Sequence, residues 1–78
     1  SDYTGLQGKA RLKFLEELYQ IALDQKNDQM AASLFNMIRD LARELGVKPG
    51  VDRAGLKALR KEISTQNSRF AIVKSIAN

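Results

Sequence analysis

The sequence contains no cysteine and no histidine, and these two absences remove several classes of chemistry. Without cysteine the chain cannot form a disulfide, and without either residue type we expect no zinc or haem site. Nucleophilic catalysis through a Cys–His pair or a Ser–His–Asp triad lacks its base. We therefore expect a protein that is not an enzyme, with no cofactor, no metal and no small-molecule substrate.

Long apolar runs are absent as well. No stretch of about 18 apolar residues occurs, so the sequence predicts no membrane-spanning helix and no membrane partner. An export signal, with a charged start, an apolar centre and a small-residue cleavage site, is not seen either. Together with the lack of cysteine, these observations lead us to expect a cytoplasmic protein.

The composition that remains is that of one small globular domain. A chain of 78 residues with 44% hydrophobic and 28% charged residues falls within the range of folded domains. A single core of this size rarely contributes more than about 3–5 kcal/mol of net stability. Because disulfides and metals are excluded as additional supports, we expect the chain to associate with itself as a homo-oligomer.

Residues 1–8 have two glycines and no periodic pattern, so we expect a flexible N-terminal segment followed by a single helical domain over residues 9–78. From Lys9 to about Gln25 the apolar residues recur with helical spacing and cover more than half of the circumference. A helix that packs against one neighbour needs a narrower stripe. We therefore predict that part of this face lies at a subunit boundary, formed by Phe14, Leu18, Tyr19 and Ile21.

Residues 28–45 carry the clearest helical pattern, with one contiguous apolar arc that has Leu41 near its middle. Asn27 or Asp28 is placed to cap the start of this helix, and Gly46 followed by Pro49 ends it. On the opposite face, acidic and basic side chains alternate as on a solvated surface with salt bridges. The short polar break before residue 28 joins two helices, so we predict an all-α fold, a small bundle of three to four helices built on an antiparallel helix pair.

A third helix is predicted from a cap at Asp52 to about Thr65, with a narrow apolar stripe. The polar sequence Gln66-Asn67-Ser68 indicates a break after it. Residues 69–77 fit a short helix, but Phe-Ala-Ile-Val is also typical of a strand, so the type of this last element stays open.

Basic side chains gather on one side of the predicted third helix. Four of them fall within about 100° of arc and have no acidic residue within that arc: Arg53, Lys57, Arg60 and Lys61. Lys48 precedes this group and extends it along the chain. Such a stripe suits contact with the phosphates of a nucleic acid, although a solvated helix face has the same pattern. The chain carries 13 basic and nine acidic residues, for a formal net charge of +4.

The segment from Leu41 to Val47 also has the spacing that ends the first helix of a helix-turn-helix motif, with Ala42 and Gly46 at the characteristic positions. In that alternative the following helix would read DNA. The positions where the motif needs apolar residues fall near Asp52 and Gly55, which are not apolar.

Residues 12–59 resemble the short small-terminase subunits of tailed bacteriophages, which recognise viral DNA for genome packaging. The resemblance lies in Leu12-Lys-Phe-Leu-Glu-Glu-Leu18, the polar break Asp24–Asp28, Leu34-Phe-Asn-Met-Ile-Arg-Asp-Leu41 and the stop Leu45-Gly-Val-Lys-Pro49. It implies an antiparallel helix pair that builds a ring-shaped oligomer, with basic flanks that bind DNA. The family's N-terminal DNA-binding segment has no counterpart before Lys9, and the basic stripe here is C-terminal.

Together the residues and the resemblance predict a self-associating protein that binds double-stranded DNA, in the cytoplasm of a bacterium or an infected host cell. Two alternatives remain open. One is a protein–protein interaction module, an adaptor or anti-factor that docks through a broad apolar helix face. The other is a helix-turn-helix transcriptional regulator.

Overall fold

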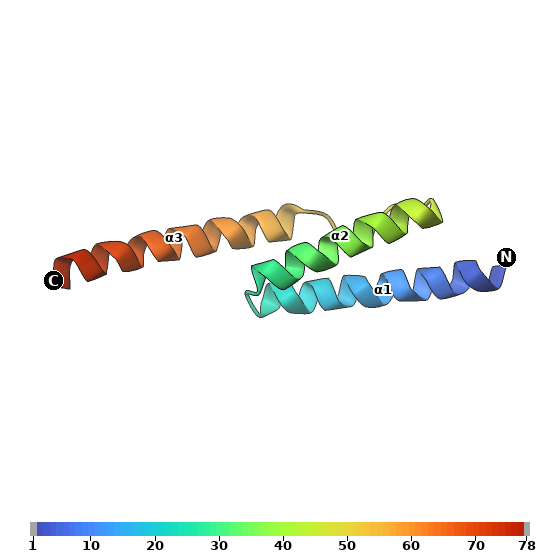
Figure 1. Ribbon diagram of the computed structural model, residues 1–78, viewed down its shortest axis with the longest axis horizontal. Helices are drawn as coiled ribbons and strands as arrows, with labels where there is room; N and C mark the ends of the chain where they lie inside the picture. Colours follow the sequence, from blue (N-terminus) through green and yellow to red (C-terminus); the bar gives the residue numbers. More distant parts are fainter. Residues whose placement is uncertain (1, 78) are drawn as a thin grey trace.

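The computed structural model describes the backbone of residues 2–77 and the side chains of residues 5–77. Within this range the chain forms three helices and no strand: α1 (Asp2–Asp24), α2 (Asp28–Leu45) and α3 (Ala54–Ala77). Helices α1 and α2 run antiparallel and side by side, and α3 begins beside them and then projects past their end (Figure 1). The predicted all-α fold built on an antiparallel helix pair is confirmed.

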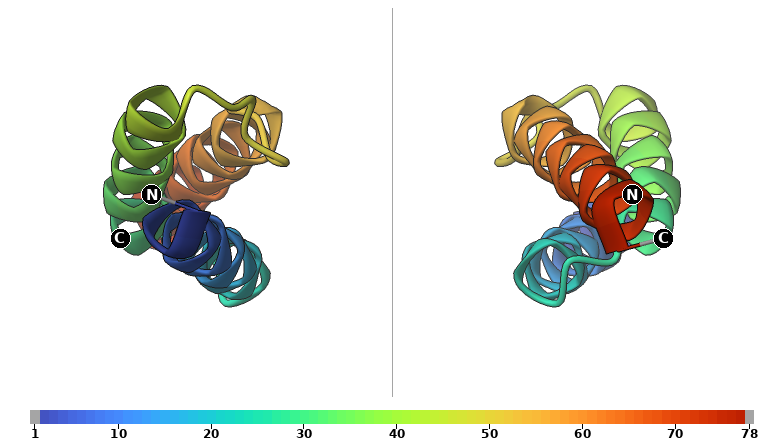
Figure 2. Two further views of the ribbon diagram at one scale, coloured as in Figure 1. Left: turned by 90° about the vertical axis from the view of Figure 1, so that its right-hand side faces the viewer. Right: turned by 90° about the vertical axis from the view of Figure 1, so that its left-hand side faces the viewer.

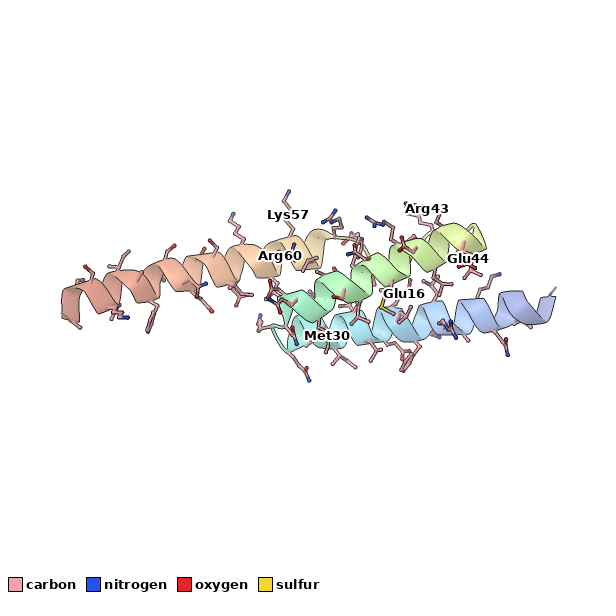
Figure 3. The ribbon with its side chains drawn as sticks, viewed as in Figure 1. Glu16, Met30, Arg43, Glu44, Lys57 and Arg60 are labelled. Atoms are coloured by element: carbon pink, nitrogen blue, oxygen red, sulfur yellow. The ribbon has the colours of Figure 1, made fainter. Side chains whose placement is uncertain are left out.

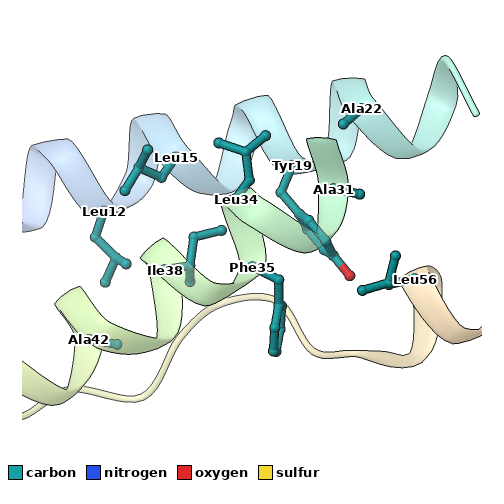
Figure 4. Packing of buried hydrophobic residues seen from close by; sticks show 10 residues of the cluster. All are labelled: Leu12, Leu15, Tyr19, Ala22, Ala31, Leu34, Phe35, Ile38, Ala42 and Leu56. Carbon is teal, nitrogen blue, oxygen red and sulfur yellow. The ribbon is translucent and has the colours of Figure 1, made fainter. Parts of the chain in front are cut away.

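The core lies mainly between α1 and α2, which we call the hairpin. Seen along the long axis of the molecule, the start of α3 adds a third corner to this pair (Figure 2). Close packing of the buried side chains along the hairpin is visible in Figure 4. The rings of Tyr19 and Phe35 lie at its centre, with their centroids 5.6 Å apart. The buried hydrophobic side chains are Leu12, Leu15, Tyr19, Ala22, Ala31, Leu34, Phe35, Ile38, Ala42, Leu56 and Leu59.

The connection between α1 and α2 is a tight turn at residues 25–27. Lys26 adopts a left-handed conformation with φ of 61°. Asn27 then caps α2, because its side-chain oxygen accepts a hydrogen bond from the N–H of Met30 at 3.1 Å. Of the two capping residues that the sequence allowed, the structure uses Asn27.

Helix α2 ends at Gly46, as predicted. This glycine has a φ of 69°, which favours a residue without a side chain. Its N–H donates to the carbonyl of Arg43, and the N–H of Val47 donates to the carbonyl of Ala42 at 3.0 Å. These two bonds form a Schellman motif, which satisfies carbonyl groups that the helix end would otherwise leave without a donor.

Two predicted boundaries are wrong. Helix α1 begins at Asp2, not at Lys9, so most of the segment predicted to be flexible belongs to the helix. Its Gly8 lies against α2, where an added Cβ would come within 2.5 Å of a methyl carbon of Leu45. A glycine that looks like a loop residue in the sequence therefore permits close approach of the two helices.

The predicted break at residues 66–68 is also absent, because α3 is continuous from Ala54 to Ala77. The polar side chains bond back to their own helix. The Thr65 hydroxyl donates to the carbonyl of Lys61 at 2.9 Å, and the Ser68 hydroxyl donates to the carbonyl of Ser64 at 3.0 Å. This back-bonding lets residues that favour turns remain inside a helix. Residues 69–77 are therefore helical and not a strand.

Helix α3 is fixed to the hairpin at its first turns. The hydroxyl of Tyr19 donates to the carbonyl of Asp52 at 2.9 Å, just before the helix begins. The carboxylate of Asp52 accepts from the N–H of Ala54 at 3.0 Å and so orients the first turn. An added Cβ on Gly55 would meet a methyl carbon of Leu23 at 2.7 Å, so α3 starts in close contact with α1.

Candidate nucleic-acid interface

The first turns of α3 present the predicted basic residues to solvent. Leu56 and Leu59 are buried against the hairpin, and this fixes the rotation of α3 about its own axis. The four basic positions are all exposed as a consequence: Arg53, Lys57, Arg60 and Lys61. The structure therefore brings these four side chains together along one side of α3.

Two of these cations have partners on α2. The Nε atom of Arg60 lies 3.6 Å from an Oδ atom of Asp28, and both side chains are partly exposed. The guanidinium carbon of Arg53 lies 5.8 Å from the centre of the Phe35 ring, within the range of a cation–π contact. The sequence showed no acid within the arc of α3, and the compensating carboxylate comes from a different helix.

Lys57 and Lys61 differ from their neighbours. Within residues 5–77, neither ammonium group lies within 4 Å of a carboxylate oxygen. Both side chains therefore keep their full charge available for an external anion. A shallow hollow beside them is lined by Arg53, Lys57 and Arg60, with the apolar side chain of Leu56 completing the lining. Phosphate oxygens accept hydrogen bonds from such groups.

The remaining predicted residue, Lys48, is exposed in the connection at residues 46–53 but lies apart from this hollow. It lines a second hollow with Tyr19, Asp52 and Gly55. Lys48 is therefore close in sequence to the basic residues of α3, yet it does not surround the same space.

Arg43 lies on α2, on the face where the sequence predicts a solvated surface with salt bridges. Figure 3 shows Arg43 and Lys57 projecting toward the same edge of the molecule, although they come from different helices. Arg43 is exposed, and no carboxylate among the described side chains lies within 4 Å of it. No spacing rule within a single helix relates positions 43 and 57, so only the packing of α3 reveals this relation.

The predicted oligomer interface divides in two. Phe14 and Ile21 are 58% and 49% exposed, and Leu18 is half-buried, so these three remain available for contact with another molecule. Tyr19 is only 1% exposed, because it packs on Phe35 inside the same chain. Its assignment to a subunit interface is wrong.

The environment of Tyr19 also affects its acidity. Burial raises the pKa of the phenol above its ordinary value of about 10, and the nearby Asp52 carboxylate raises this pKa further. A hydrogen bond with the backbone of Leu56 and the Arg53 guanidinium lower the pKa but do not cancel the rise. Tyr19 is therefore a neutral structural donor at physiological pH.

Among the described residues, no cluster of three or more acidic, cysteine or histidine side chains could hold a metal ion. The same part of the chain has no helix that is both long and apolar enough to cross a membrane. The described surface instead carries exposed charged side chains and exposed apolar side chains, which could contact other molecules.

Comparison of the chain with known protein families, with curated proteins and with solved structures gives no match. The local geometry does bear on the helix-turn-helix alternative. Helices α2 and α3 are joined by residues 46–53, whereas the motif uses a turn of about three or four residues. The two helices run in opposite directions along the molecule (Figure 1), so this geometry gives that alternative no support.

Proposed function

We propose that this protein is a non-enzymatic, self-associating protein that binds double-stranded DNA through the exposed basic side of α3. The observation that carries the proposal is the group of exposed cations around the hollow at Leu56. Among the exposed cations of α3, Lys57 and Lys61 make no ion pair with a carboxylate of residues 5–77. Phosphate contacts of this kind give affinity that is independent of sequence and sensitive to salt.

Arg43 supports the proposal because it extends the positive surface from α3 onto α2. A surface shared by two helices can contact more than one phosphate along a duplex. Each neutralised phosphate releases counterions, and several copies of the chain acting together multiply a weak contact into a useful affinity.

The resemblance of residues 12–59 to small-terminase subunits supports a biological setting for this activity. On that reading, the duplex is viral DNA that is recognised for genome packaging in the cytoplasm of a bacterium or infected host cell. On the same reading, the hairpin would take part in the oligomer, and the basic side of α3 would contact the duplex.

A duplex-binding titration of Lys57→Gln/Lys61→Gln tests the proposal. Both side chains are exposed and make no ion pair with residues 5–77, so the change should alter stability by no more than about 0.5 kcal/mol per site. We expect duplex affinity to fall at least tenfold. The slope of the logarithm of affinity against the logarithm of salt concentration should decrease by about 2 units.

The matched control is Lys9→Gln/Lys13→Gln, which removes the same two charges from exposed positions on α1. We expect this control to change the affinity much less than tenfold. Equal losses in the two variants would mean that only net charge matters, and an unchanged affinity in the α3 variant would refute the basic-surface proposal.

A protein–protein interaction module is the second candidate, and a specific observation favours it. Large apolar side chains are exposed on both the hairpin and the end of α3, including Phe14, Met37, Phe70 and Ile76. Contiguous exposed apolar surface marks interaction sites. A wild-type protein that shows no salt-dependent duplex binding, at 50 mM or at 200 mM salt, would favour this candidate over DNA binding.

A further inference from the structure

Apolar residues of α3 recur at an alternating spacing of three and four, with the polar Gln66 at one position of the series. We call this series the seam, and its members are Leu56, Leu59, Ile63, Gln66, Phe70, Val73 and Ala77. Such a seven-residue repeat is typical of a helix that is covered by another helix along one side. The first half of the seam is covered by the hairpin, since Leu56 and Leu59 are 3% and 4% exposed.

The second half of the seam has no cover within residues 5–77. Phe70 and Val73 are 69% and 63% exposed, although they continue the same spacing. They lie on the part of α3 that projects beyond the hairpin (Figure 1), which we call the tail, residues 66–77. Ile72 and Ile76 add further exposed apolar area beside them. The seam therefore continues a buried pattern at positions that no other residue within the described range covers.

The hairpin has an uncovered apolar surface of its own. Contacts to α3 and to the connection before it come from one side of the hairpin, through Leu23, Phe35 and Asp28. The opposite flanks of α1 and α2 carry exposed or half-buried apolar residues, which together we call the hairpin face: Phe14, Leu18, Ile21, Met30, Met37 and Leu41. Figure 3 shows Met30 on the opposite side of the molecule from Lys57 of α3.

Helical geometry places these residues on one side of the hairpin. Phe14 and Ile21 are seven residues apart on α1, and Met30 and Met37 are seven apart on α2, so each pair shares a flank of its helix. Viewed along each helix from its N-terminus, this flank lies on the same rotational side of the buried stripe in α1 and in α2. The residues that contact α3 lie on the other rotational side. Because the helices are antiparallel, the two flanks meet on the side without α3.

The tail and the hairpin face match in length. Phe70 to Ile76 spans about 9 Å of helix, and Phe14 to Ile21 spans about 10 Å, at 1.5 Å per residue. A tail laid along the hairpin face would therefore cover the exposed apolar residues of both helices. The tail cannot reach the face of its own chain, because α3 leads away from the hairpin.

The two surfaces also match in charge. Residues 63–77 contain the cations Arg69 and Lys74 and no acidic residue. The hairpin face is bordered by four exposed carboxylates, each three positions from one of its apolar residues: Glu17, Asp24, Asp40 and Glu44. One exposed cation, Arg11, has the same spacing from Phe14, so the border carries more negative than positive charge. A tail packed against a second tail would instead bring like charges together.

We propose that the tail of one copy of this chain packs on the hairpin face of a second copy. The contact joins different surfaces of the two molecules, so each copy offers one tail and one face, and the assembly grows into a ring or a filament. This inference deepens the self-association in the proposed function by naming the surfaces that meet. It does not depend on DNA binding.

Two variants that each remove one surface test the inference by light scattering or sedimentation, without DNA. The tail variant is Phe70→Gln/Val73→Gln and the face variant is Phe14→Gln/Met37→Gln, all at exposed positions. We expect wild type to assemble at tens of micromolar, and each variant alone to associate at least a hundredfold more weakly. An equimolar mixture still holds one intact tail and one intact face, so it should form a species of twice the single-chain mass.

The mixture separates this arrangement from the alternatives. If tails pair with tails, the face variant alone still associates like wild type, and if faces pair with faces, the tail variant does. Either result would overturn the inference, and so would a mixture in which no dimer forms. A wild-type protein that has the mass of one chain at 100 µM would overturn it as well. Leu6→Gln is the control, because Leu6 is 69% exposed on α1 but lies outside the hairpin face, and it should assemble like wild type.

Two further measurements connect the result to the physical argument. Helix content by circular dichroism should be unchanged in both variants, which shows that lost assembly is not lost folding. Raising the salt from 50 mM to 500 mM should weaken wild-type assembly, because it screens the basic tail from the acidic border. Normal assembly with no duplex binding would refute the DNA binding of the proposed function and leave this inference standing. Duplex binding by a strictly monomeric wild type would refute this inference, together with the self-association on which it rests, and leave the DNA binding standing.

Discussion

Tyr19 connects all three helices of the described chain. Its ring packs on Phe35 of α2, and its hydroxyl donates to the carbonyl of Asp52 immediately before α3. The side chain is 1% exposed, so the hydroxyl group has exchanged most of its contact with water for this one bond. A neutral hydrogen bond of this kind contributes about 0.5–1.5 kcal/mol to folding.

We expect Tyr19→Phe to lower the free energy of unfolding by about 0.5–1.5 kcal/mol at neutral pH. The ring packing is kept, and only the bond to the Asp52 carbonyl is lost. Urea unfolding followed by circular dichroism measures the change. Stability equal to that of wild type would mean that the contact between Tyr19 and the start of α3 does not persist in solution.

The same pair of proteins tests the raised pKa of Tyr19. The pKa of Tyr19 in the folded state lies above its value of about 10 in the unfolded chain. The neutral phenol therefore contributes fully to the free energy of unfolding below pH 10, and this contribution is lost as the pH rises through the folded pKa. Wild type should therefore lose stability above about pH 10 more steeply than Tyr19→Phe. Lysine deprotonation affects both proteins equally, so parallel curves would contradict the assigned pKa direction.

At the scale of the helices, glycines have opposite roles that depend on backbone conformation. Gly46 has a φ of 69° at the end of α2, and Gly5 lies within α1 with open space around the position of a Cβ. The left-handed conformation disfavours a side chain, whereas a helix interior favours alanine over glycine.

We expect Gly46→Ala to destabilise the protein by about 1–2 kcal/mol and Gly5→Ala to stabilise it by about 0.5–1 kcal/mol. Thermal unfolding of the two variants beside wild type gives the comparison, and each is the control for the other. Changes of the same sign would show that the left-handed cap does not decide how α2 ends.

Helix α2 was the element that the sequence predicted best, and the reason is local. Its cap at Asn27, its apolar arc and its stop at Gly46 are all set by neighbours within four residues. The arc did not reveal depth of burial, however. Ile38 is fully buried, whereas Leu41, which the sequence placed near the middle of the arc, is half-buried because it borders the hairpin face.

The two boundary errors have a common physical cause. Gly8 and Ser68 are residues that favour loops and turns when only local preference acts. In the fold, Gly8 permits close packing on Leu45, and Ser68 donates to its own helix. Contacts that form only after folding decided both positions, so propensity alone could not predict them.

At the scale of the whole molecule, the chain is extended. Its radius of gyration is 17.0 Å, whereas a compact domain of 78 residues would have about 11.5 Å. The excess comes from the tail, which projects along the 64 Å length of the molecule. Exposed helical backbone with few tertiary contacts opens with a low free energy.

We therefore expect the amides of residues 66–77 to exchange with solvent much faster than those of α2, in a sample dilute enough to have single-chain mass. Residues in the middle of α2 should approach the protection set by global unfolding. Hydrogen exchange followed by NMR measures both regions at once. Equal protection in the tail and in α2 would show that the tail is covered within its own chain.

The candidate site shows the same division between local and global information. The helical periodicity of residues 53–61 correctly predicted that Arg53, Lys57, Arg60 and Lys61 would be exposed together. It could not show that Asp28 would partner Arg60 or that Arg43 would join the same edge. These relations depend on how α3 packs on the hairpin, which no spacing within one helix encodes.

The tight turn at residues 25–27 has a consequence for how quickly the chain can reach its fold. Because only three residues separate α1 from α2, most of the core forms between neighbours in sequence, and closing such a short loop costs little entropy. Chains with mainly local contacts fold in microseconds to milliseconds. The hairpin can therefore form before α3 packs on it, so a folding chain first presents its apolar surfaces on both sides.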